Sequence, residues 1–148
     1  MKEYVQNYFQ AERKNQMDEL DQQILYLLNE NSKLSNKKIG EKIHLTGQAV
    51  GQRIAYLKDQ GIIENYTITI KQDEKQFIRI FMETNQFATI ERVINEFKEI
   101  DEFYKVSGHA CYLVVAHFNQ PRLKVFIEKI SKWARCSVDS VVGSRKKI

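Results

Sequence analysis

The chain has 148 residues, of which 43% are hydrophobic and 28% charged, and its formal net charge at pH 7 is +4. This composition excludes a disordered or fibrous protein and allows one ordinary hydrophobic core or two small ones, of which we favour two. No apolar run approaches the ~20 residues that span a bilayer, and no signal segment opens the chain, so we expect a cytoplasmic protein without a membrane partner.

Residues 1–16 form an N-terminal extension with two possible interpretations. The first is a short amphipathic helix with an apolar face, followed by a polar linker. The residues of that face would be Tyr4, Val5, Tyr8 and Phe9. The second is a frayed tail, or an extension upstream of a start at Met17.

Residues 17–64 predict three helices arranged as a winged-type helix-turn-helix. The expected N-caps of these helices are Asp18, Ser35 and Thr46. We expect the first helix to end near Asn31, a tight turn at His44-Leu45, and the third helix to end at Gln60. Gly61 would then take the left-handed position after that helix. Gly40, in the second helix, would let a neighbouring helix approach closely.

The third helix has the pattern of a helix that reads DNA. Its apolar stripe would pack inward, while Gln48 and Gln52 would present amide groups to adenine edges and Tyr56 would reach a phosphate or a thymine methyl group. Gly51 suggests close approach to DNA, unless it is merely tolerated, and Arg53 fits a phosphate contact or an intramolecular ion pair. The expected DNA contacts are Lys37, Lys38, Thr46, Gln48, Gly51, Gln52, Arg53 and Tyr56.

Positive charge is concentrated on this part of the chain. Between Asn31 and Lys58 there are six lysines and arginines and one acidic residue, whereas residues 1–30 hold three basic and six acidic residues. A basic excess on a helix-turn-helix is the electrostatic footprint expected for phosphate binding. Charge clustering alone would indicate only a solvated face.

The segment after the third helix predicts a strand and a domain boundary. Residues 62–70 become alternately apolar and polar after Asn65 and contain many β-branched residues, which favours a strand. The polar run 71–75 would close this linker strand, which we place at residues 65–75.

Residues 76–148 predict a β-α-β-β-α-β domain, which makes the chain an α+β protein with a ferredoxin-like second domain. The expected strands are 76–83, 103–107, 111–118 and 137–142, and the helices run through Phe87 to Phe97 and from Pro121 to Trp133. Both helices of such a fold cover one face of the sheet, yet apolar residues alternate onto both faces of the first and third strands. We therefore expect a second copy of the sheet on the open face, across a twofold axis.

The motifs MDELDQQILYLLNENSKLSNKKIGEKI, LTGQAVGQRIAYLKDQGII and VSG resemble the leucine-responsive regulator and asparagine regulator (Lrp/AsnC) family of transcription factors. The resemblance begins at about Met17 and reaches the C-terminus. It implies a cytoplasmic regulator that binds double-stranded promoter DNA, with dimers built through a ligand-sensing (RAM-type) domain and often joined into tetramers or octamers. It also implies a small-molecule effector near the loop after the second strand.

The candidate effector loop departs from the family pattern. The family usually has a Gly-Asp-x-Asp arrangement, where this chain has Gly108-His109-Ala110-Cys111. The missing carboxylates are the natural partners of a ligand ammonium group, so the loop predicts an effector other than a typical free amino acid. The candidate residues are Ser107, Gly108, His109, Ala110, Cys111 and Tyr112, and a structural hairpin without a ligand is the alternative.

The sequence leaves two alternative functions open. The architecture also resembles haem-precursor (sirohaem-type) decarboxylases, with His109 or His117 as acid or metal ligand, but ~26 Å of strand would separate these residues at ~3.3 Å per residue. A metal- or redox-responsive DNA-binding sensor would use His109 with Cys111. The two cysteines, Cys111 and Cys136, lack zinc-knuckle or disulfide spacing, and generic catalytic motifs are absent. We expect no enzyme activity, catalytic residue, resident metal or cofactor.

Overall fold

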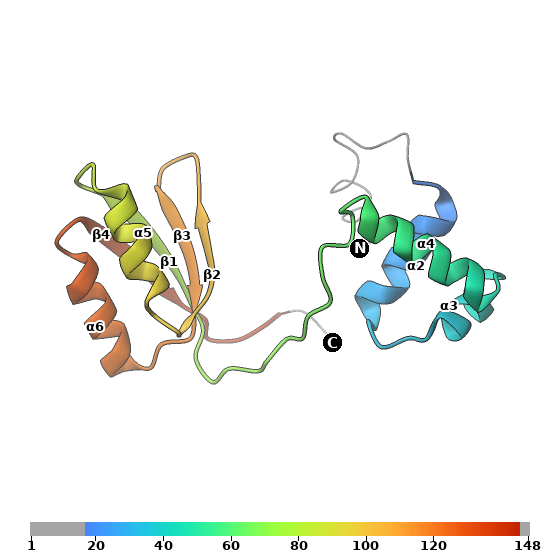
Figure 1. The fold of residues 1–148 in the computed structure, drawn as a ribbon. Coiled ribbons are helices and arrows are strands. Elements are labelled where there is room, and N and C mark those ends of the chain that lie inside the picture. Colours follow the sequence, from blue (N-terminus) through green and yellow to red (C-terminus); the bar gives the residue numbers. More distant parts are fainter. Residues whose placement is uncertain (1–16, 146–148) are drawn as a thin grey trace. The chain divides into compact units, whose positions relative to one another are not determined.

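The computed structural model describes residues 17–145, and the chain divides into two units between Thr69 and Ile70 (Figure 1). The helix predicted within residues 1–16 lies outside the described residues. Each unit has a hydrophobic core of its own and is described separately below.

The first unit contains helices α2 (Glu19–Glu30), α3 (Asn36–Ile43) and α4 (Gly47–Asp59). Each predicted N-cap is confirmed, because the side chain of Asp18, Ser35 or Thr46 accepts a hydrogen bond from the backbone N–H three residues later. Their stripes meet in one core made of Ile24, Leu28, Ile39, Ile43, Val50, Ile54 and Leu57.

The turn between α3 and α4 explains why residue 40 is a glycine. His44 ends α3 in the left-handed conformation, with φ at 60°, and the N–H of Leu45 donates to the carbonyl of Gly40. A Cβ atom on Gly40 would lie 2.3 Å from the carbonyl oxygen of Leu45. The close neighbour that requires this glycine is therefore the backbone of the turn.

The predicted end of α4 is correct to within one residue. The helix ends at Asp59 with Gln60 as its C-cap, and Gly61 has a φ of +67°, as expected for the residue after a helix. The N–H groups of Ile62 and Ile63 donate to the carbonyl of Leu57 at 2.9 and 3.1 Å.

The strand predicted over residues 62–70 is wrong. Residues 62–75 contain no strand, and Tyr66, Ile68 and Ile70 are 46%, 75% and 66% exposed. The alternating pattern correctly marks an extended, β-branched segment. A strand also needs a hydrogen-bonding neighbour along its length. In the described part of the chain, the linker has one backbone hydrogen bond to another segment, from the N–H of Val141 to the carbonyl of Lys75 at its end.

The second unit is the predicted β-α-β-β-α-β domain. It comprises β1 (Gln76–Met82), α5 (Phe87–Asn95), β2 (Ile100–Lys105), β3 (Tyr112–Ala116), α6 (Gln120–Ile130) and β4 (Ala134–Ser140). The strands form one antiparallel sheet in the order β2-β3-β1-β4, and α5 and α6 lie on the same face of it (Figure 1). Ile78 and Ile80 point to these helices and are fully buried.

Two strands and one tryptophan lie differently from the prediction. β2 starts at Ile100 and β4 at Ala134, each three residues earlier than expected. Ile100 already pairs with Ala116 of β3, and β4 pairs with β1 along its whole length, from Ala134 opposite Met82 to Ser140 opposite Gln76. Trp133 follows α6 rather than belonging to it. Its indole N–H donates to Gln86 at 3.1 Å.

The buried amide of Gln76 fixes the start of β1. Its Nε2 donates to the carbonyl of Phe118, and its Oε1 accepts from the N–H of the same residue, both at 2.9 Å. This side chain is fully buried and pairs both of its polar atoms. It thereby joins the first strand to the segment that leaves β3.

The second face of the sheet is apolar at its centre. Phe77 lies opposite Val115 on the neighbouring strand, and Leu113 lies between Arg79 and Tyr104. Phe77 is 37% exposed, and no described helix of this unit covers this face. The predicted alternation of apolar residues onto two faces is confirmed.

Candidate DNA-binding face and effector loop

The outward side of α4 carries the predicted reading groups. Val50, Ile54 and Leu57 are buried, and the residues between them point away from the core. The exposed residues of this helix include Gln48, Gln52, Ala55 and Tyr56. Side chains with amide and phenol groups on the exposed side of a helix can form hydrogen bonds with base edges and phosphate oxygens.

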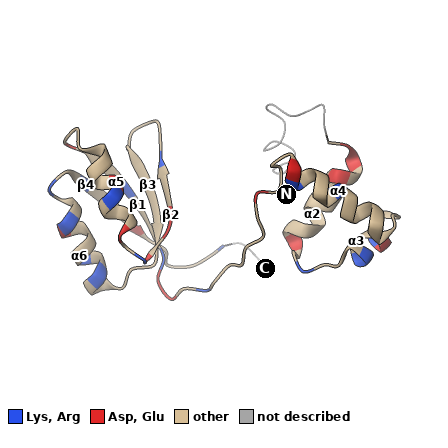
Figure 2. Cartoon of the chain, in the orientation of Figure 1, with Lys and Arg blue, Asp and Glu red and all other residues tan. Residues whose placement is uncertain are grey.

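The lysines of α3 are exposed and without an ion pair. Lys37, Lys38 and Lys42 lie on α3 (Figure 2), and none of them forms a salt bridge within residues 17–145. Glu41 is the one acidic residue of this helix. The second helix of the helix-turn-helix therefore presents positive charge that the first unit leaves uncompensated.

Thr46 has its predicted role as the N-cap of α4, and its contact with DNA stays a prediction. Its hydroxyl oxygen accepts a hydrogen bond from the N–H of Ala49 at 3.1 Å and so begins α4. The side chain is exposed, and its hydroxyl proton remains free to be donated.

Gly51 has an internal neighbour. A Cβ atom at this position would lie 2.9 Å from the amide nitrogen of Asn36, the first residue of α3. At Gly47 the nearest atom would be the backbone nitrogen of Lys37, at 3.3 Å. The atom near Gly51 belongs to the end of an exposed side chain that can shift, so packing of α4 against α3 does not by itself require this glycine.

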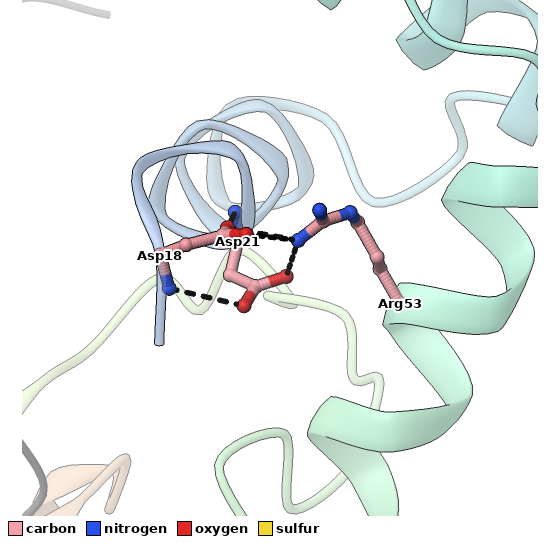
Figure 3. A network of polar contacts seen from close by, with 3 residues as sticks. All are labelled: Asp18, Asp21 and Arg53. Carbon is pink, nitrogen blue, oxygen red and sulfur yellow. Dashed lines mark hydrogen bonds and ion pairs between the residues drawn. The ribbon is translucent and has the colours of Figure 1, made fainter. Parts of the chain in front are cut away.

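Arg53 has the intramolecular ion pair that was one of its two predicted roles. Its Nη1 lies 2.7 Å from Asp18 Oδ2 and 2.9 Å from Asp21 Oδ1, at the start of α2 (Figure 3). The backbone N–H of Asp21 and then the guanidinium of Arg53 hold the pKa of the Asp18 carboxyl below its usual value. In return, the two carboxylates raise the pKa of Arg53.

The role of Asp18 and Asp21 in binding Arg53 goes beyond their predicted role at the start of a helix. The sequence contains a signal for this role in the Asp-x-x-Asp spacing of a capping box, but it does not identify a partner 32 or 35 positions away. Asn36, the neighbour of Gly51, was missed for the same reason.

The candidate effector loop connects β2 and β3, and its members do not form one group. Ser107, Gly108 and His109 are exposed, Ala110 and Cys111 are half-buried, and Gly108 has a φ of +142° that favours glycine. The ring of His109 lies 5.1 Å from that of Phe81, edge to face. The N–H of Cys111 donates to the carbonyl of Ile80 at 2.9 Å.

Tyr112 belongs to the core and not to the exposed loop. It begins β3, is 1% exposed, and its hydroxyl donates to Glu91 of α5 at 2.5 Å. Burial first, and the neighbouring carboxylate second, raise the pKa of this phenol far above its usual value. A ligand at the exposed loop would therefore have to displace helix packing to reach its hydroxyl.

His109 and His117 have different neighbours. His117 pairs with Asp101 at 2.9 Å, whereas His109 lies at the loop, and burial raises the pKa of the Cys136 thiol. Among residues 17–145, no three His, Cys, Asp or Glu side chains are grouped to hold a metal ion.

In the same part of the chain, no helix has the length and apolar character needed to cross a membrane.

Two family models match the chain. The AsnC-type helix-turn-helix domain matches residues 17–58, and the Lrp/AsnC ligand binding domain matches residues 75–141. The matches correspond to the two units described above, the three helices and the four-stranded sheet with its two helices.

Two relatives from Bacillus subtilis are similar in sequence. The transcriptional regulator LrpB is 43% identical over 104 residues, which cover 67% of this chain and 70% of LrpB. The transcriptional regulator LrpA is 36% identical over 137 residues, which cover 86% of this chain and 98% of LrpA.

Solved structures share the fold. B. subtilis LrpC has a TM-score of 0.81 at 22% identity, covering 89% of this chain and 99% of its own. A transcriptional regulator from Neisseria meningitidis, solved as a complex with L-Met, has a TM-score of 0.77 at 21% identity, covering 88% and 93%. The chain therefore belongs to the Lrp/AsnC family of DNA-binding transcriptional regulators and is not an enzyme.

Proposed function

We propose that this regulator reads a degenerate palindrome in promoter DNA as a homodimer. Two copies of α4, related by a twofold axis, would enter successive major grooves on one side of the duplex. The observation that carries the proposal is the exposed side of α4, with Gln48, Gln52 and Tyr56, beside the unpaired lysines of α3. Chromosomal DNA as the partner supports a cytoplasmic location.

The reading groups are few, which makes pairing of two helices necessary. A bidentate contact from an amide to adenine contributes about 1–3 kcal/mol of discrimination, and a single α4 offers two such amides. Gln48 and Gln52 would read bases, while Lys37, Lys38 and Tyr56 would contact the DNA backbone and Thr46 would donate its hydroxyl proton to phosphate.

Selection from a random duplex pool tests this proposal. The folded protein should enrich sequences with two related half-sites about one helical turn apart, and it should shift the selected duplex at salt concentrations at which a shuffled duplex stays free. Enrichment of no sequence at low salt would contradict sequence-specific reading.

The open face of the sheet supports a dimer. Phe77, Leu113 and Val115 form an apolar centre, which the ion pair of Arg79 with Asp139 borders. A second copy of this face would cover the apolar centre and let each ion pair remain at the rim. Tetramers and octamers would add contacts between such dimers.

Sedimentation equilibrium tests this surface. Leu113→Asp should convert the dimer to a monomer and weaken binding to the palindrome by at least tenfold, because the second half-site contact becomes bimolecular. Val125→Asp, at an exposed position of α6, makes the same change from an apolar to an acidic side chain and should leave the dimer intact. A dimeric Leu113→Asp variant would exclude this face as the interface.

The match to a ligand binding domain supports a small-molecule effector, and we propose that Ser107 to Cys111 contact it. The domain boundaries follow this division, with the helix-turn-helix at 17–64, a linker at 65–75 and the effector domain at 76–148. Because the loop lacks paired carboxylates, the effector should differ from a free amino acid such as the L-Met of the Neisseria complex.

Isothermal titration calorimetry with L-amino acids and with the corresponding 2-oxo acids tests this effector class. The oxo acids, which lack an ammonium group, should bind, and His109→Ala should weaken that binding. Binding of the amino acids alone would contradict the proposal. Binding of neither series would favour the structural hairpin that was the alternative for this loop.

A further inference from the structure

Arg53 is the arginine of the DNA-reading helix, yet its charged group is directed to another helix. Its Nη1 lies 2.7 and 2.8 Å from the two carboxylate oxygens of Asp18 and 2.9 Å from Asp21 Oδ1 (Figure 3). The side chain is 30% exposed, so part of its surface is in solvent. An arginine on a helix-turn-helix would ordinarily be assigned to a phosphate.

The two carboxylates that hold Arg53 also begin α2. The N–H of Asp21 donates to Asp18 Oδ1 at 2.9 Å, and the N–H of Asp18 donates to Asp21 Oδ2 at 3.2 Å. This reciprocal capping box holds both carboxylates in the positions at which Arg53 binds them. The guanidinium therefore joins the middle of α4 to a rigid point at the start of α2.

Moving Arg53 to a DNA phosphate would be costly. The side chain of Asp21 is 6% exposed, and Arg53 is the cation that lies against it. A nearly buried carboxylate that loses its cation is left with its desolvation penalty uncompensated. The cluster of two carboxylates and one guanidinium also carries net negative charge, which repels phosphate.

We propose that Arg53 is a positioning residue for DNA reading: it fixes the orientation of α4 against the first turn of α2 and makes no contact with phosphate. The inference rests on the proposed function of α4 as the reading helix. The apolar contacts of Val50, Ile54 and Leu57 keep α4 folded and packed without it. The ion pair restricts the remaining tilt and rotation of the helix, on which the placement of Gln48 and Gln52 depends.

A positioning role and a phosphate contact differ in how binding depends on salt. Each phosphate contact contributes about 0.9 to the slope of log affinity against log salt concentration, because bound counterions are released. Loss of a phosphate contact lowers this slope and weakens binding to all sequences. Loss of positioning leaves the slope unchanged and lowers the ratio of affinities for the selected and the shuffled duplex.

The experiment measures both quantities by fluorescence anisotropy from 50 to 300 mM KCl for wild type, Arg53→Gln and Lys38→Ala. Arg53→Gln should keep the wild-type slope and lose about tenfold in the affinity ratio, which corresponds to ~1.4 kcal/mol. Lys38→Ala should lower the slope by about 0.9 per protomer and keep the ratio. A lowered slope or an unchanged ratio for Arg53→Gln would overturn the inference.

Two further variants keep the test decisive. If Arg53→Gln fails to fold by circular dichroism, Arg53→Met replaces it, because methionine keeps an aliphatic side chain and lacks the charged nitrogen that contacts both carboxylates. With this variant the salt slope should stay at the wild-type value and the affinity ratio should fall. Asp21→Asn should lower the ratio in the same direction, and an unchanged ratio would count against the proposal. Absence of any sequence preference in the wild type would instead contradict the proposed function itself.

Discussion

Helix α3 of the first unit and the helices of the second unit use positive charge in opposite ways. On α3, Lys37, Lys38 and Lys42 are exposed without an ion pair in the described part of the chain. In the second unit, every arginine from β1 to β4 forms an ion pair, and lysines of α6 do the same. The arginines in question are Arg79, Arg92, Arg122 and Arg135.

The difference identifies which charges are available to a partner. An arginine that already has a carboxylate gains little from a phosphate, because it must first give up its internal contact. A lysine surrounded by water releases a counterion from DNA at no such cost. Arg53 is the exception within the first unit, and its internal ion pair is the reason to assign it to structure.

The largest expected effect is a loss of stability in the first unit alone, caused by Gly40→Ala. Gly40→Ala would place a Cβ atom 2.3 Å from a backbone oxygen of the turn, so we expect the first unit to lose about 3 kcal/mol or more. The second unit should keep its own transition. Thermal unfolding followed by far-UV circular dichroism and by Trp133 fluorescence would resolve the two, since Trp133 lies in the second unit.

Gly51→Ala is the matched control for that variant. Its Cβ atom would meet only the end of the Asn36 side chain, at 2.9 Å, and a helical alanine gains roughly 0.5–1 kcal/mol over glycine. We expect a change within ~1 kcal/mol of wild type. Equal destabilisation by the two substitutions would show that the turn backbone is not the strict neighbour of Gly40.

Removal of a reading group should change discrimination by about 1–3 kcal/mol. Gln52→Ala deletes an exposed amide of α4 without touching the core, so the preference for the selected duplex should fall while folding stays intact. Competition binding against duplexes with single base substitutions would locate the lost preference. Uniform loss across all duplexes would assign Gln52 to the DNA backbone instead.

The ion pair at the start of α2 predicts a pH dependence confined to the first unit. The folded state lowers the pKa of Asp18, so the folded chain binds this proton less well than the unfolded chain does. The stabilisation is therefore present above about pH 4 and is lost as the pH falls through the lowered pKa.

Asp18→Asn isolates this contribution, because asparagine is also a good N-cap. At pH 7 the free energy of unfolding of the first unit should be roughly 0.5–1 kcal/mol higher in the wild type than in the variant, as expected for an exposed ion pair. This difference should vanish near pH 2. Urea unfolding across this pH range measures it. A difference that grows toward low pH would have the wrong sign for the mechanism.

The smallest effect is expected on the outer surface of the second unit. Lys124 pairs with Glu128 one helical turn away at 3.9 Å, and such exposed pairs contribute about 0.3–0.5 kcal/mol. Lys124→Ala should change the free energy of unfolding of the second unit by no more than this amount. It should leave the affinity for DNA unchanged. A marked loss of DNA binding would place the second unit in the DNA interface.

Local signals in the sequence predicted most of the elements, because caps and periodicity act within a few residues. Asp18, Ser35 and Thr46 each begin the expected helix, and alternation places Ile78 and Phe77 on opposite faces of the sheet. The second unit follows the expected order of strands and helices.

The errors and omissions concern neighbours that are distant in the sequence. The strand predicted near Ile68 needed a backbone partner, and the start of β4 depends on its pairing with Met82. Tyr112 was predicted at the end of the effector loop, because the sequence does not show that its hydroxyl donates to Glu91 of α5. The carboxylates beside Arg53 are likewise visible only once α2 and α4 are packed together.

The most direct test of the unpaired charge on α3 compares two triple variants in one salt titration. Replacement of Lys37, Lys38 and Lys42 by alanine should lower the salt slope of binding to the selected duplex by about 0.9 for each lost phosphate contact. Replacement of Lys124, Lys129 and Lys132, which removes the same charge from the second unit, should leave it at the wild-type value. Equal slopes for the two variants would contradict the account.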